Sequence, residues 1–92
     1  MDRGDTYKVL AGRLDDVRRE GYEKLLTRIG RGAVSETVWF HGEPVEVTVE
    51  VLWADRKMQK IRVRGSALGP SIWAMERLDE SFVMGPNAAV ED

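Results

Sequence analysis

The sequence of 92 residues contains no cysteine, a single histidine and only 3 prolines. The absence of cysteine excludes a disulfide framework, cysteine-ligated zinc, iron–sulfur clusters and a cysteine nucleophile. Positive charge is not in excess either, since 14 basic and 16 acidic side chains give a net charge of −2. A protein with this balance is not expected to bind nucleic acid strongly without sequence preference, although the balance is compatible with a local basic patch.

Long apolar runs are also missing. No stretch approaches the roughly 20 consecutive apolar residues that a transmembrane helix needs, and residues 1–5 contain no apolar signal region. We therefore expect a soluble, cytoplasmic protein that does not contact a membrane. The chain is 42% hydrophobic and 33% charged, which is typical of a globular protein. Because a chain of this length forms one domain, we expect residues 1–92 to be a single α+β domain with loose ends at 1–5 and 86–92.

The first third of the chain has the apolar period of an amphipathic helix, from Thr6 to Ile29. Charged residues occupy the opposite face of this helix. The glycines of Gly30-Arg31-Gly32 predict its end, because glycine readily adopts the left-handed conformation that follows a last helical turn. The apolar positions are Leu10, Leu14, Val17, Leu25 and Ile29.

Gly12 and Gly21 weaken this helix, each by about 1 kcal/mol relative to alanine. An unbroken helix would be roughly 37 Å long, whereas a compact chain of this size has a radius of gyration of only about 12 Å. We therefore favour a kink near Gly21, with Tyr22–Ile29 docked on a sheet. The alternative is a continuous helix that projects Leu10 and Leu14 into water, where they would pair with a second copy in a homodimer.

The middle third predicts an antiparallel β-meander. In the predicted strand Val45–Trp53, valine alternates strictly with polar residues as far as Val51, which indicates one buried and one solvated face. The composition of Thr37–Phe40 and Met58–Arg64 predicts its two neighbours, and His41–Pro44 and Ala54–Lys57 have turn composition. We expect the helix to cover the valine face and to bury Val47, Val49, Ile61 and Val63.

A register follows from placing the valines on one face. This register places apolar residues opposite one another in the first hairpin and residues of opposite charge across from one another in the second. Such pairs each stabilise a sheet by about 0.2–1 kcal/mol. The predicted partners are Val38 with Val47, Phe40 with Val45, Glu50 with Lys60, and Glu46 with Arg64.

Residues 70–84 are ambiguous between a helix and a fourth strand. Leu78 and Phe82 continue a helical spacing, but Ser71–Met75 is also a plausible short strand. We favour the strand, followed by an irregular stretch Leu78–Met84 that packs on the core through Phe82. The expected sheet then has three to four strands and ends in a short C-terminal segment.

No pattern in the sequence indicates catalysis, a metal site or a cofactor. His41 lies in a predicted turn, and no serine stands in a Gly-x-Ser-x-Gly elbow. His41 and Glu43 could share a metal ion, but they have no histidine or cysteine partner, so a metal site is not indicated. Gly30-Arg31-Gly32 follows a helix rather than a strand, so it does not match a dinucleotide-binding fingerprint. We therefore predict a non-enzymatic protein with no catalytic, metal-binding or cofactor-binding residues.

The solvated face of the predicted sheet is the most informative surface. Strand parity places Trp39, Lys60, Arg62 and Arg64 on it, and we take these four as candidate binding residues. A tryptophan beside arginines can stack single-stranded bases, so one hypothesis is a single-stranded nucleic-acid binder. The partly covered sheet, the amphipathic helix and the 3 tryptophans instead favour a protein–protein interaction module whose partner is another protein or a second copy. We prefer this second hypothesis.

Overall fold

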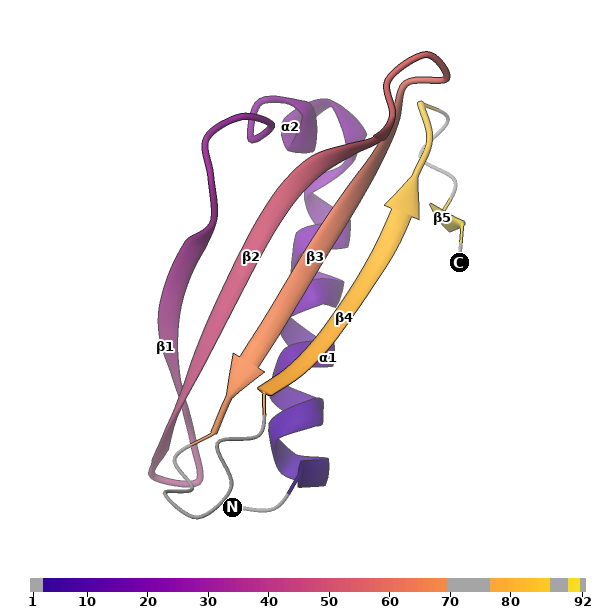
Figure 1. The fold of residues 1–92 in the computed structure, drawn as a ribbon. Coiled ribbons are helices and arrows are strands. Elements are labelled where there is room, and N and C mark those ends of the chain that lie inside the picture. Colours follow the sequence, from indigo (N-terminus) through magenta and orange to yellow (C-terminus); the bar gives the residue numbers. More distant parts are fainter. Residues whose placement is uncertain (1–2, 70–76, 87–89, 92) are drawn as a thin grey trace.

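The computed structural model describes residues 3–69, 77–86 and 90–91. In this part of the chain, two helices lie on one face of an antiparallel sheet whose strands follow one another in chain order (Figure 1). This arrangement confirms the predicted α+β class. The elements are α1 (Arg3–Glu20), α2 (Tyr22–Leu26), β1 (Val34–Phe40), β2 (Glu43–Asp55), β3 (Lys60–Leu68), β4 (Arg77–Met84) and β5 (Val90–Glu91).

The helical region is broken at Gly21, as predicted. This residue has φ 90° and ψ 159°, a conformation that glycine adopts readily and other residues avoid. Glu20 and Arg28 form a half-buried ion pair of 3.1 Å that spans the break. Because the chain turns here, Leu10 and Leu14 are buried on their own sheet. The argument for a homodimer from a projecting helix therefore does not apply to this structure.

The hydrophobic core lies between α1 and the sheet. Val47, Val49, Ile61 and Val63 are buried there, as predicted. Gly65 of β3 faces the helix, and a Cβ built on it would lie 2.8 Å from Leu14 Cδ2. The missing side chain therefore lets the helix approach the middle strand of the sheet closely. The remaining buried apolar residues are Val9, Leu10, Val17, Tyr22, Leu25, Val45, Val51, Ala67, Leu78, Phe82 and Met84.

The turn between β1 and β2 is shorter than expected and corrects the register of the first hairpin. His41 and Gly42 alone form the loop, and both have positive φ, 50° and 77°. This is the pattern of a type I′ hairpin turn. It pairs Val38 with Val45 and Phe40 with Glu43, so the predicted pairs Val38–Val47 and Phe40–Val45 are wrong by two positions. An even shift leaves every side chain on its predicted face.

The second hairpin, β2–β3, also has a loop and a register that differ from the prediction. The β2–β3 loop covers residues 56–59, later than the predicted turn, and the ladder is irregular between Trp53 and Asp55. As a result Glu50 lies opposite Arg64 and Glu46 lies opposite Leu68. The predicted pairs Glu50–Lys60 and Glu46–Arg64 are therefore wrong by four positions. The register differs because the loop lies further along the chain than predicted. Its residue Gln59 takes a left-handed φ of 56°, which the composition did not indicate.

Leu78–Met84, expected to be irregular, belongs to the regular strand β4, which pairs along its length with β3. Phe82 is buried, as predicted, and lies opposite Val63. The strand was missed because Glu80, on its helix-facing side, is exposed, which removes the alternation of apolar and polar residues. The expected strand Ser71–Met75 lies outside the described residues.

Parts of both end segments belong to regular elements. Residues 3–5 of the segment 1–5 belong to α1, and Val90–Glu91 in the segment 86–92 pairs with β4. Neither helix of the described part of the chain is both long and apolar enough to cross a membrane.

Candidate functional site

Two surfaces of the sheet that none of the described helices covers are candidate sites. One is the face opposite the helices, which we call the outer face. The other is the free edge of β1, at the left of the sheet in Figure 1. A shorter edge that is unpaired within the described residues, Arg77–Phe82 of β4, also lies beyond the two-residue β5. The outer face is built by alternate residues of the four long strands, and the free edge by the backbone of β1 alone.

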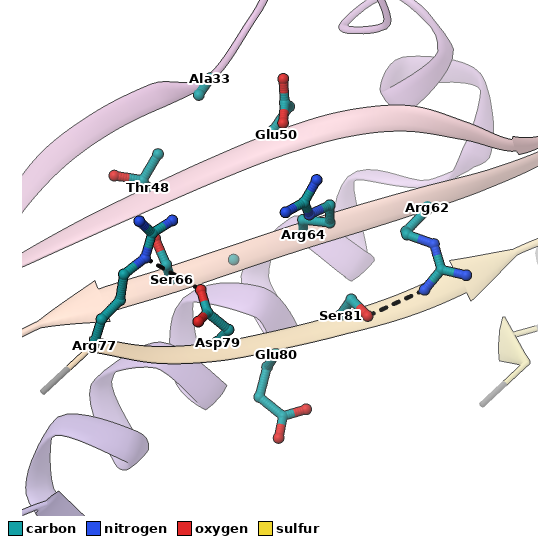
Figure 2. Close-up of a pocket in the computed structure, with 11 residues that line it drawn as sticks. Ala33, Thr48, Glu50, Arg62, Arg64, Ser66, Arg77, Asp79, Glu80 and Ser81 are labelled. Atoms are coloured by element: carbon teal, nitrogen blue, oxygen red, sulfur yellow. Dashed lines mark hydrogen bonds and ion pairs between the residues drawn. The ribbon is translucent and has the colours of Figure 1, made fainter.

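The outer face contains a shallow depression of about 410 Å³ over β2, β3 and β4. Arg62, Arg64 and Arg77 line it, and Glu50 and Asp79 lie among them (Figure 2). The Nε atom of Arg77 is 3.3 Å from Oδ1 of Asp79. Since acidic side chains alternate with the arginines, the depression is not a uniformly cationic groove.

Arg62 and Arg64 differ in the contacts that they make with neighbouring strands. Arg62 Nη1 donates a 3.3 Å hydrogen bond to Ser81 Oγ on the neighbouring strand (Figure 2). Arg64 lies opposite Glu50 in the register, and no hydrogen bond or ion pair joins the two. Glu80 also borders the depression, but its side chain points away from the outer face (Figure 2).

The structure brings together some of the predicted binding residues and separates others. Arg62 and Arg64 line the depression, and Lys60 precedes them on the same strand. Trp39 is on the outer face too, but it lies opposite Pro44, whereas Arg64 lies opposite Glu50. Pro44 and Glu50 are six positions apart along the extended strand β2, which corresponds to roughly 20 Å. The tryptophan therefore does not stand beside the arginines.

The free edge of β1 is a surface that sequence reasoning missed. The strand has seven residues, of which only Val38 and Phe40 are partly buried. Its register with β2 is continuous from Val34 to Phe40, so it has no bulge. Within the described part of the chain, no strand pairs with its other side.

The hairpin geometry determines which backbone groups of β1 point outward. Residues that flank a two-residue loop form a hydrogen-bonded pair, and such pairs then alternate along the ladder. Phe40 flanks the loop, so the even-numbered residues of β1 bond to β2. The N–H and C=O groups of Ser35, Thr37 and Trp39 therefore point to the free edge. Ser35 Oγ lies 2.8 Å from Thr48 Oγ1, as expected where side chains of a non-hydrogen-bonded pair approach closely.

This edge has few of the features that usually prevent strands from pairing with other chains. Such features are charged side chains, lysine above all, prolines, bulges and short length. The sequence Val34–Phe40 contains no basic residue and no proline. Its one charged residue, Glu36, forms an ion pair with Arg13 of α1. At the other end of the strand order, β5 has only two residues.

Two large apolar side chains of β1 are exposed to solvent. Val34 is 55% exposed and Trp39 is 68% exposed, one on each face of the strand. The signal that could have revealed the full strand was the even spacing of Val34, Val38 and Phe40, which continues the alternation beyond the predicted Thr37–Phe40.

The structure contains little that resembles reactive chemistry in its described part. No cluster of three or more histidine and carboxylate side chains there could hold a metal ion. His41 is exposed in the β1–β2 turn, where its ring stands edge-on to Phe40 with 4.3 Å between centroids. Comparisons with protein-family models, curated proteins and solved structures find no match to this chain.

Proposed function

We propose that this chain is a small, non-enzymatic, cytoplasmic protein that binds another protein chain by strand addition at the free edge of β1. The observation that carries the proposal is the edge itself: seven residues, continuous and without a lysine, proline or bulge. Strand addition is a common mode of peptide recognition, in which main-chain hydrogen bonds supply affinity and alternate side chains supply specificity.

The position of α1 supports the same proposal. This helix packs mainly across β3, with β2 and β4 on either side, and β1 lies to one side of it (Figure 1). An incoming strand can therefore reach β1 without displacing the helix. Trp39 on the outer face and Val34 on the helix-facing side are the exposed apolar contacts that such a strand would cover.

The experiment is site-specific photo-crosslinking with the full chain expressed in cells. A photoreactive amino acid replaces Ser35 at the free edge or, as a control, Met58, which is exposed in the β2–β3 turn. We expect discrete covalent products from position 35 and few from position 58. A Thr37→Pro change in the same chain should abolish the products from position 35. It removes an outward N–H and no hydrogen bond to β2.

Two outcomes would contradict the proposal. One is equal labelling from both positions, which would indicate random collision. The other is labelling from position 35 that Thr37→Pro does not reduce, since strand addition requires the N–H group at that position. Circular dichroism of the purified Thr37→Pro chain verifies that its fold is intact.

The alternative function is binding of single-stranded nucleic acid on the outer face, with Lys60, Arg62 and Arg64 contacting phosphates. The row of cations on β3 supports it. The interleaved acids and the distance of Trp39 from the arginines favour the edge instead. A labelled oligonucleotide titrated at several salt concentrations separates the two: we expect no binding at physiological salt. Micromolar affinity that falls with salt and with Arg62→Glu would favour the alternative.

A further inference from the structure

The outward backbone groups of β1 are arranged symmetrically about its centre. Ser35, Thr37 and Trp39 present their N–H and C=O groups to the free edge, and Thr37 is the middle residue of the strand. An antiparallel strand with the same alternation would bond to all three. A strand that matches this pattern over its whole length is β1 of a second copy, turned around a two-fold axis.

Two-fold axes at three neighbouring residues of β1, Glu36, Thr37 and Val38, would each pair the strand with a second copy of itself. An axis through Thr37 aligns all seven residues of both strands, pairing Ser35 with Trp39 of the other copy. An axis through Glu36 would oppose two glutamates whose Cα atoms lie about 4.5 Å apart, a destabilising pair of like charges. An axis through Val38 would pair only the five residues from Glu36 to Phe40.

We propose that the partner of β1 is β1 of a second copy of this chain, paired antiparallel around a two-fold axis at Thr37 into one continuous sheet. This inference rests on the proposed function, because it names the strand that is added. Closed two-fold dimers are the commonest homo-oligomers, and a self-complementary edge is what such an interface requires. Pairs centred on Thr37 supply about six main-chain hydrogen bonds, two for each pair of facing residues.

The side chains agree with this register. On the helix-facing side Val34, which is 55% exposed, would lie against Phe40 of the other copy. On the outer face Trp39, which is 68% exposed, would lie beside Ser35 of the other copy. The two most exposed apolar residues of the strand would thus both be covered, and Glu36 would face a valine while keeping its ion pair with Arg13.

The test uses opposite charges at the proposed axis. Thr37→Lys and Thr37→Glu each place two like charges opposite one another, whereas an equimolar mixture of the two variants pairs a lysine with a glutamate. Sedimentation velocity at high micromolar concentration should show wild type at twice the 10.4 kDa mass of the chain. Each variant alone should dissociate at least about tenfold more readily, and the mixture should recover the dimer.

Met58→Lys and Met58→Glu are matched controls, because they add the same charges at an exposed position in the β2–β3 turn. They should leave the dimer unchanged. A mixture of the Thr37 variants that stays monomeric overturns the register. A wild-type monomer that still gives proline-sensitive crosslinks to other proteins from position 35 overturns self-pairing and leaves the proposed function standing. A monomer without such crosslinks overturns both.

Discussion

At the scale of single residues, three glycines of this chain differ in how far they depend on the missing side chain. Gly21 takes a φ of 90° where the helix breaks, and Gly65 lies where two leucines of α1 approach β3. Gly12 has neither role, since it lies in α1 where an added Cβ would meet nothing within 4 Å. Only the first two positions depend on the missing side chain.

The first prediction contrasts Gly21 with Gly12. Gly21→Ala should destabilise the protein by about 1–3 kcal/mol, because alanine is strained at this positive φ although the space is open. Gly12→Ala should stabilise it by up to about 1 kcal/mol, because alanine is the better helix former. Urea denaturation of both variants measures the difference. A stabilised Gly21→Ala would mean that the helix is continuous.

The second prediction concerns Gly65. A Cβ there would lie 2.8 Å from Leu14 Cδ2 and 3.1 Å from Leu10 Cδ1, and both leucines are buried. Gly65→Ala should therefore destabilise the protein by about 1–3 kcal/mol through overpacking. Thermal unfolding followed by circular dichroism tests this. An unchanged melting temperature would show that α1 does not pack closely on β3.

The weak helical position of Gly21 could be predicted from the sequence, because glycine costs helix stability at any site. The importance of Gly65 could not. It depends on which helical residues meet β3 across the core, and that contact joins segments about 50 positions apart in the chain. Local patterns carry no information about such a contact.

At the scale of secondary structure, faces were predictable and registers were not. Alternation determines which side of a strand is buried, so Val47 and Val49 were placed correctly. Register depends on how many residues each loop takes, and here His41 and Gly42 alone form the first loop. For the same reason Trp39 and Arg64 could be assigned to one face, but the distance between them could not be inferred.

The third prediction tests the assignment of faces with two neighbours in β2. Val49→Ala should cost about 2 kcal/mol, because it leaves a cavity between β2 and the helix. Thr48→Ala, on the outer face, should cost less than about 1 kcal/mol, mainly the hydrogen bond to Ser35. Equal losses in chemical denaturation would contradict the uncovered outer face.

The fourth prediction concerns how α2 is held to the sheet. The hydroxyl of the buried Tyr22 donates a 2.5 Å hydrogen bond to the backbone oxygen of Gln59 in the β2–β3 loop. Tyr22→Phe keeps the ring and removes this bond, so it should cost about 0.5–1.5 kcal/mol. A melting curve identical to wild type would show that the loop and α2 are not coupled in solution.

At the scale of the whole molecule, the position of one helix explains why an edge is left available. The protein measures 43 × 20 × 18 Å along its principal axes. The helix α1 lies mainly over β3, and β1 lies to one side of it (Figure 1). The core is therefore centred on β3, and β1 extends beyond the cover of α1. Among the strands of the described chain, β1 has the longest edge without a strand partner, Val34–Phe40 against Arg77–Phe82 of β4.

The central claim, that the free edge of β1 is a strand-binding surface, is tested most directly by amide hydrogen exchange measured by NMR at several protein concentrations. The amides of Glu36, Val38 and Phe40 bond to β2 and should be protected at every concentration. Those of Ser35, Thr37 and Trp39 should exchange rapidly in dilute solution and become protected as the concentration rises and copies pair. The account would be contradicted if these three amides exchanged rapidly at every concentration of the protein and if no added partner strand protected them.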